Sequence, residues 1–542
     1  MTPKNISLNH SLAKAQFGTA VDRIDRTHIW HLQIMAIPSD HWDICLAVLQ
    51  KISDDPSLID DHDRCKSLIA KIYRHGRKGL RRSSHQERHA ADRKLKNATA
   101  MVRHQKRYSV PRLMSDVPAQ EPNLAAIRAL TADTAANAQS RESFGSNEVS
   151  LPPDLAAAHL HRPIPCYVCK QRYTELHFFY HLLCPGCAEM NFKKRQQCTD
   201  LCGRSALLTG GRIKIGYQLG LRLLRDGARV ILTTRFPADC AARYGAESDF
   251  LQWCDRLEIH ALDLRSIPAV EAFAHQLLQA ESSLNIVINN AAQTIKRPLA
   301  FYQHVLDLEE QTFNQLSLQA RQLISNDPRI PANAQLARTE LMEARFRSGA
   351  FDANQLPEVI NAFFPPRHLD ADGQQVDLRP TNSWLQKLGA VSTIEMLEVQ
   401  LVNTIAPFIF NSKLKPLLMN SAFPRRFIVN VSAMEGQFSR ETKTSNHPHT
   451  NMAKAALNMM TRTAAADYAK DGIYMNSVDT GWITNENPVP VKAKIEETQD
   501  TYTPLDTIDG MARVYDPIAR GVNEAQAPLF GCFLKDYAPY PW

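Results

Sequence analysis

Four cysteines form two Cys-x2-Cys pairs within CYVCKQRYTELHFFYHLLCPGC. The pairs are Cys166 with Cys169 and Cys184 with Cys187, and fourteen residues separate them. Each pair can supply two thiolates to one tetrahedral ion, which is the ligand set of a closed structural zinc site. The sequence therefore predicts a small zinc-binding module. Four buried thiols in an apolar subdomain are the alternative.

The same segment resembles part of a RING finger through the spacing His181-x2-Cys184-x2-Cys187. A complete RING finger would need a second metal site, for which His181, Cys198 and Cys202 are the candidates. Phe179 stands at the third-ligand position, and three residues separate Cys198 from Cys202 where two are usual. These departures argue against ubiquitin-ligase activity and favour a module with one zinc ion.

A glycine-rich loop follows the short apolar run SALLT, in the sequence TGGRIKIG. Gly210, Gly211 and Gly216 would let the backbone turn tightly and approach a pyrophosphate at the positive end of the next helix. A glycine-rich loop alone is a weak signal. This one lies between a strand pattern and a helix pattern, and that context predicts nucleotide binding.

Alternating strand and helix patterns position this loop. Buried strands separated by helices indicate a parallel sheet covered on both faces. We therefore predict an α/β fold with a doubly wound, Rossmann-like sheet, and an insertion at about 298–386 that interrupts it. The predicted strands lie in the runs 205–209, 228–234, 257–264, 284–292, 425–432, 473–479 and 528–535.

These motifs together resemble the short-chain dehydrogenase/reductase family, over about 205–300 and 385–540. The run from Thr209 to Gly216 resembles the family's TGxxxGxG, with Lys214 in place of the middle glycine. The resemblance implies an oxidoreductase that acts on a carbonyl or hydroxyl compound with a nicotinamide cofactor. The residues that it implies for cofactor binding are Thr209, Gly210, Arg212, Lys214, Ile215, Gly216, Arg235, Asp263, Leu264, Asn289, Asn290, Ala291, Lys454 and Thr484.

The catalytic positions that the resemblance implies are Asn403, Ser432, Thr450 and Lys454. In the family, a tyrosine four residues before the lysine exchanges a proton with the substrate oxygen. Thr450 stands there, and its aliphatic hydroxyl is a far weaker acid than a phenol. Ser432, a water held by Thr450 and Lys454, or the nearby His447 and His449 are the remaining proton donors.

Charge indicates which nicotinamide cofactor is bound. An arginine at the end of the second strand favours a 2′-phosphate, whereas a carboxylate favours a free 2′-hydroxyl. Here the strand ends in TTRFP with Arg235 and no acid, and Arg212 and Lys214 add positive charge in the glycine loop. NADP(H) is therefore favoured over NAD(H).

The 542 residues predict several domains: a helical basic region at 1–107, a linker or partly disordered segment at 108–160, the zinc module at 161–203, and the nucleotide-binding domain at 204–542. The segment from Lys71 to Arg112 has a net charge of +12 and the rest of the chain −5. This segment could bind a protein or nucleic-acid partner, although a solvated basic helix is the simpler interpretation.

The N-terminal sequence has no apolar core typical of a secretory signal. No run approaches the roughly 18 apolar residues of a membrane span. We therefore expect a cytoplasmic protein that does not associate with a membrane. We also expect it to form a homo-oligomer. The favoured function is an atypical oxidoreductase. The alternative is a catalytically silent NADP(H)-binding sensor or scaffold that uses its zinc and basic segments to bind a partner. The insertion is expected to lie over the nicotinamide side of the sheet.

Overall fold

The computed structural model describes residues 39–107, 158–325, 362–366, 368–370, 372–440 and 442–542. The chain divides into two compact units, Met1–Gln86 and Glu87–Trp542. The first unit contains α1 (Ser39–Asp54), η1 (Pro56–Ile59) and the first part of α2 (Asp63–Asn97). Helices therefore occupy the described part of the region predicted to be helical. Most of the predicted linker, and part of the basic segment, lie outside the described residues.

The second unit is built on an eight-stranded sheet with the order β10-β9-β8-β7-β6-β3-β4-β5. Every pairing is parallel except that of the terminal hairpin. The strand order reverses at β3, and ligands of such sheets bind beside the carboxyl ends of the strands at this point. The strands are β3 (Ser205–Thr209), β4 (Arg229–Thr234), β5 (Leu257–Ala261), β6 (Ile286–Asn289), β7 (Arg426–Ser432), β8 (Ile473–Asp479), β9 (Phe533–Lys535) and β10 (Ala538–Tyr540).

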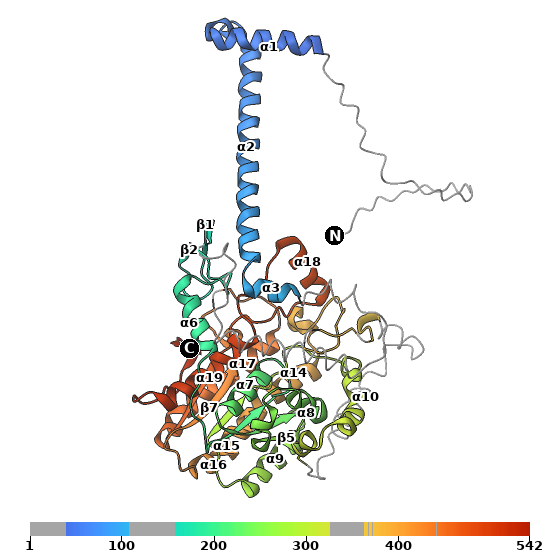
Figure 1. Cartoon of the computed structure of the whole chain (residues 1–542), viewed down its shortest axis with the longest axis vertical. Coiled ribbons are helices and arrows are strands. Elements are labelled where there is room, and N and C mark those ends of the chain that lie inside the picture. Colours follow the sequence, from blue (N-terminus) through green and yellow to red (C-terminus); the bar gives the residue numbers. More distant parts are fainter. Residues whose placement is uncertain (1–38, 108–157, 326–361, 367, 371, 441) are drawn as a thin grey trace, which may run out of the picture. The chain divides into compact units, whose positions relative to one another are not determined.

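Helices cover both faces of this sheet (Figure 1). Side chains of successive strand residues point to opposite faces, so Leu208 packs with α7 (Lys214–Arg225) and α19 (Thr507–Asn523), whereas Leu207 packs with α9 (Ile267–Ala280) and α15 (Ala406–Lys413). This arrangement confirms the predicted doubly wound α/β fold.

One long helix carries a predicted catalytic residue. It comprises α14 (Thr393–Gln400), a π-helical turn (Leu401–Ile405) that contains Asn403, and α15. Among the described helices, this one is long and apolar enough to span a membrane, and half of the apolar stretch is buried. Val402, Ile409 and Phe410 of this helix belong to the core on the face of the sheet that α9 covers. Packing in a folded domain therefore explains the apolar composition of the helix.

The cysteine-containing module is a small subdomain of β1 (His159–Pro165), β2 (Arg172–Glu175) and α6 (Pro185–Arg195). Strand β1 begins at His159, slightly before the predicted boundary at 161. The module is fixed to α19 by buried polar contacts: Arg195 pairs with Asp506 at 2.7 Å and with Asp509 at 3.0 Å. The two segments thus form one compact body.

The prediction for the position of the insertion is wrong for its first part. Helices α10 (Leu299–Gln315) and α11 (Leu318–Gln322) pack against α8 (Pro237–Gly245), which follows β4. Residues 326–361 lie outside the described residues. The end of the insertion reaches the start of α17 (Pro448–Lys470), where the Gln386 carbonyl accepts a hydrogen bond from the amide of the N-cap residue His447 at 2.7 Å.

Candidate functional site

The glycine positions of the loop between β3 and α7 leave no room for side chains. A Cβ added at Gly216 would lie 2.1 Å from the Gly210 carbonyl oxygen and 2.6 Å from the Asn290 side-chain nitrogen. Gly210 itself has φ +70°, and its added Cβ would lie 2.9 Å from Ala291. The loop therefore presents bare backbone at the N-terminus of a helix, which is the arrangement that fits a pyrophosphate.

The paired asparagines after β6 hold this loop in place. The Asn290 side chain donates to the carbonyls of Thr209 at 3.1 Å and Gly210 at 3.0 Å. The amides of Asn290 and Ala291 both donate to the Thr209 hydroxyl. Asn289 instead points into the core and donates to Asn411 and Asn430 at 2.8 Å each.

Lys214, which stands where the family motif has a glycine, has a left-handed backbone conformation. Its φ is +54°, a left-handed conformation that costs a residue with a Cβ about 1 kcal/mol. Burial lowers the pKa of Lys214, but the carboxylates of Glu486, Asp372 and Asp370 outweigh burial and raise it. The ammonium therefore stays charged beside the loop. The neighbouring Ile215 packs against Gly510 on α19.

The end of β4, where the adenosine ribose would lie, is occupied by side chains of the insertion. Glu309 of α10 accepts hydrogen bonds from the amides of Ala238 at 2.5 Å and Asp239 at 3.3 Å, at the start of α8. Burial raises the pKa of Glu309 to about 7. Arg212 pairs with Asp239 at 2.6 Å and donates to Gln374 at 2.7 Å. The positive charge of Arg212 is thus already compensated.

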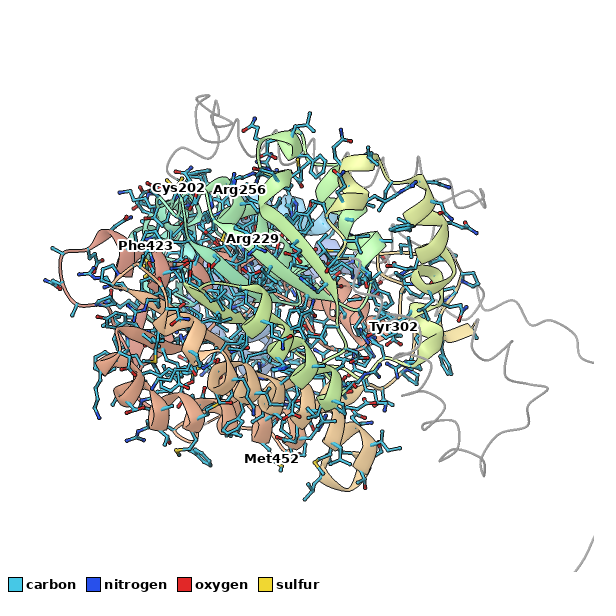
Figure 2. All side chains as sticks on the ribbon, turned by 90° about the horizontal axis from the view of Figure 1, so that it is seen from below. Cys202, Arg229, Arg256, Tyr302, Phe423 and Met452 are labelled. Atoms are coloured by element: carbon cyan, nitrogen blue, oxygen red, sulfur yellow. The ribbon has the colours of Figure 1, made fainter. Side chains whose placement is uncertain are left out.

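Arg235 forms no direct salt bridge with a carboxylate among the described residues, although its charge acts on the nearby Asp263 carboxylate. Its guanidinium lies 4.4 Å from the ring centre of Tyr302, a residue of α10 that is labelled in Figure 2. Asp263, one of the residues implied for cofactor binding, pairs with Arg265 at 2.7 Å, and Leu264 is buried in the core. Of the basic residues named for cofactor choice, Arg235 is the one best placed to meet a phosphate.

If a 2′-phosphate binds at Arg235, substituting glutamine for Glu309 is expected to raise NADP(H) affinity about tenfold, because one negative charge disappears from the end of β4. In the wild type, affinity should fall as the pH rises through about 7, where this carboxyl becomes charged. Titration calorimetry on both sides of that pH should show a flat profile for Glu309→Gln. Glu271→Gln, on the exposed side of α9, is the control. Equal affinity of wild type and Glu309→Gln at high pH would contradict the prediction.

The predicted catalytic side chains lie around the carboxyl end of β7. The Lys454 ammonium, on α17, donates to the Val431 carbonyl at 2.7 Å, and the Ser432 hydroxyl donates to Asn458 at 2.6 Å. Burial lowers the pKa of Lys454 to about 8, although Glu435 opposes this. Asn403 does not join them directly, because its side chain bonds both the amide and the carbonyl of Gln293.

Thr450 occupies the tyrosine position on the first turn of α17. Residues four apart share a helix face, so Thr450 lies on the side of Lys454. Its side chain is buried, and its hydroxyl has no hydrogen-bond partner among the residues that the structure describes. Thr484 lies apart from these residues, and its hydroxyl donates to Glu486 at 2.5 Å.

Next to Thr450 in the sequence, His449 forms a buried pair with a carboxylate, and only the histidine of this pair was identified from the sequence. His449 lies with its Nε2 3.4 Å from a carboxylate oxygen of Glu395 on α14, and both side chains are almost fully buried. The sequence indicated His449 as a candidate acid, but Glu395 is far away in the chain and has no motif. The one signal in the sequence that could have identified Glu395 is its place in the same helix pattern as Asn403.

The four cysteines converge, as their spacing predicts. Their sulfur atoms all lie within 4.8 Å of one another, and those of Cys169 and Cys184 are 3.7 Å apart. Four sulfurs bound at about 2.3 Å to one tetrahedral zinc ion would be about 3.8 Å apart, so the site fits this ion. In the described part of the chain, this is the one group of His, Cys, Asp or Glu residues arranged to hold a metal.

A family profile described as "Enoyl-(Acyl carrier protein) reductase" matches residues 383–514. An uncharacterized protein of Acanthamoeba polyphaga mimivirus is 30% identical over 366 residues, which cover 65% of this chain and 71% of that protein. Dehydrogenase/reductase SDR family member 13 of Bos taurus is 38% identical over 109 residues, covering 19% of this chain and 27% of that protein. Retinol dehydrogenase 13 of Mus musculus is 32% identical over 91 residues, which cover 17% of this chain and 27% of that protein.

Among solved structures, an NADPH-bound carbonyl reductase from chicken fatty liver is similar, with 17% identity and a TM-score of 0.38. The comparison covers 63% of this chain and all of that one. A short-chain dehydrogenase from Burkholderia cenocepacia in complex with NADP gives 17% identity and the same TM-score, over 62% of this chain and 97% of that one.

Proposed function

We propose that the chain is a member of the short-chain dehydrogenase/reductase family and an NADP(H)-dependent oxidoreductase acting on a carbonyl or hydroxyl compound. The observation that carries the proposal is the position of Lys454 and Ser432 at the end of β7. This strand is separated from the glycine loop only by β6. A dinucleotide on the loop would therefore extend toward these two side chains.

In the reductive direction, the cofactor supplies the hydride that reaches the carbonyl carbon. The chain must supply the proton for the substrate oxygen. We assign Lys454 as the source, because burial lowers its pKa to about 8, far below that of an alcohol. The hydroxyls of Ser432 and Thr450 hold the substrate oxygen and can pass the proton to it. One proton and one hydride are consumed for each alcohol formed.

The experiment is to follow the oxidation of NADPH with a panel of aldehydes and ketones, for the wild type and for Thr450→Tyr. Turnover by the wild type that increases at least about tenfold in Thr450→Tyr would support the proposal, because a phenol is a far stronger acid than the threonine hydroxyl and passes the proton on more readily. Thr498→Tyr, on the exposed side of α18 (Val489–Gln499), is the control. Failure of both the wild type and Thr450→Tyr to oxidise NADPH would contradict it.

A second function, as a catalytically silent cofactor sensor or scaffold, is favoured by the unpaired aliphatic hydroxyl of Thr450. It predicts NADPH binding without turnover. It also predicts a protein or nucleic-acid partner for the basic segment 71–112, with association that weakens as salt is added. Calorimetry with NADPH, together with a salt titration of any complex formed, distinguishes this function from the first.

We propose that the four cysteines bind one structural zinc ion. Replacing Cys184 with alanine removes one of the ligands, and the expected result is loss of one equivalent of zinc in elemental analysis. Metal and folding are coupled in such modules, so a chelator should lower the unfolding temperature of the wild type. Cys198→Ala removes an exposed thiol and should retain the metal. Unchanged zinc content in Cys184→Ala would contradict the proposal.

We also propose that the chain forms a homo-oligomer through the outer face of α14, α15 and α17. Leu397, Phe408, Met452 and Met459 are each more than half exposed there, and Figure 2 shows Met452 at the outer margin of the domain. Exposed apolar patches of this kind mark interfaces. Phe408→Glu should yield monomers in sedimentation analysis, whereas Leu251→Glu, at another exposed apolar residue, should not. Oligomers of Phe408→Glu would exclude this face.

A further inference from the structure

In the described part of the chain, several buried polar atoms on α17, the helix of Thr450, and on the segments packed against it have no hydrogen-bond partner. Besides the Thr450 hydroxyl, they include Nε2 of Gln437, Nδ2 of Asn458 and Nδ1 of His449, and all four residues are at most 4% exposed. The Gln386 oxygen and Nδ1 of His447 are unpaired as well. Buried polar groups are nearly always paired, and leaving them unpaired destabilises a protein. Such a concentration of unpaired groups indicates a polar ligand.

The elements that carry these atoms are packed around the first turns of α17. A Cβ added at Gly436 would lie 2.6 Å from the Lys454 backbone and 2.8 Å from the Asn458 side chain. This close approach places the following residue, Gln437, against α17. From the other side, Trp384 stacks on the His447 ring, with ring centres 3.9 Å apart. Unpaired groups therefore lie on two different segments that pack against the first half of α17, which carries Thr450.

The charged groups in this region largely compensate one another. Glu395 lies beside His449, with 3.4 Å between the nearest atoms, and Glu435 pairs with Arg440 at 2.5 Å. What is left unpaired is mainly amide, imidazole and hydroxyl groups. Neutral donors and acceptors of this kind match hydroxyl groups. An aliphatic chain would leave every one of these groups unpaired. A site built to bond hydroxyl groups rejects an analogue without them more strongly than an apolar pocket rejects an added hydroxyl.

We propose that the substrate is a neutral, polyhydroxylated carbonyl compound, of the aldose or ketose type, rather than an aliphatic aldehyde or ketone. The proposal rests on the proposed function and names its substrate class. The carbonyl oxygen lies at Thr450 and Lys454, and the hydroxyl groups bond Gln437 and Asn458 on one side and Gln386 and His449 on the other. Hydride from the reduced cofactor reaches the carbonyl carbon, and a proton reaches the oxygen.

The test compares glyceraldehyde with propanal, which has the same carbon skeleton without the hydroxyl groups, using the whole chain with NADPH. The expected kcat/KM is at least about a hundredfold higher for glyceraldehyde, since a site built to bond hydroxyl groups rejects the analogue that lacks them. Gln437→Leu should lower this preference about tenfold, mainly through KM. Gln279→Leu, on the exposed side of α9, should keep the preference.

A preference for propanal, or equal values for the two aldehydes, would overturn the substrate class and leave the proposed function standing. If neither aldehyde is reduced, the proposed function is in question, and the substrate class is tested by binding instead. Calorimetry of glyceraldehyde and of propanal with the NADP-saturated protein then decides. Tighter binding of glyceraldehyde that is weakened in Gln437→Leu supports the inference, and equal or weaker binding overturns it.

Discussion

Replacing Lys454 with methionine is expected to lower kcat/KM for carbonyl reduction by about a hundredfold or more, which is the usual contribution of a positioned proton donor. Methionine preserves much of the volume but provides neither the charge nor the hydrogen bond to the Val431 carbonyl. Steady-state kinetics with NADPH measure the change. A proton donor acts on the chemical step, so the loss should appear in kcat more than in KM.

The pH dependence of the wild type gives an independent test. Because burial lowers the pKa of Lys454 to about 8, the lysine loses its proton above this pH, and the reduction rate should fall with a midpoint near it. Lys470→Met, at the exposed end of α17, should leave both rate and midpoint unchanged. A wild-type rate that stays constant well above pH 8 would exclude Lys454 as the proton source.

Adding one methyl group at Gly216 is expected to weaken NADP(H) binding at least about a hundredfold. The new Cβ would lie 2.1 Å from the Gly210 carbonyl oxygen and 2.6 Å from the Asn290 side chain, so the loop must move. The same interactions hold the loop against β6, and overpacking of this kind costs about 1–3 kcal/mol of stability. Calorimetry with NADP measures affinity, and thermal unfolding without cofactor measures stability.

Gly389→Ala is the matched control, because a Cβ at Gly389 meets no atom within 4 Å. This variant should bind NADP and unfold like the wild type. If Gly216→Ala is folded and binds NADP as tightly as Gly389→Ala does, the glycine loop is not the pyrophosphate site. The assignment of the whole cofactor cleft would then be wrong, independently of the chemistry at Lys454.

The sequence predicts the sheet well because its strands are short apolar runs bounded by turn residues. All seven predicted runs contain a strand, and β3 coincides with its run. The last run is the weakest case, because only Phe533–Lys535 of 528–535 is a strand. Hairpin strand β10 was missed: the three residues of its segment, Ala538, Pro539 and Tyr540, give no alternating pattern. Its pairing with β9 depends on the turn between them.

Part of the candidate site is predictable because its residues follow strands. Thr209, Asn290 and Ser432 end or follow β3, β6 and β7, so sheet geometry alone brings them to one edge. The contacts of the insertion could not be predicted this way. Glu309 bonds an amide 71 residues away, and Gln374 bonds a side chain 162 residues away. No local pattern encodes such pairs, and the cofactor roles assigned from the motifs stay predictions.

The segment after α11 has a consequence for how copies of this chain can associate. The backbone of Leu323–Ser325 exchanges hydrogen bonds of 2.7 and 2.9 Å with Ile259 on β5, the last strand of the sheet. At the opposite margin, the short β9–β10 hairpin folds back on itself. Strands left open invite edge-to-edge aggregation. The chain thus covers the β5 margin at Ile259, and Pro539 in the outermost strand β10 has no amide hydrogen to donate. Strand addition between molecules is therefore disfavoured at both margins, and helical faces are the more suitable surfaces for self-assembly.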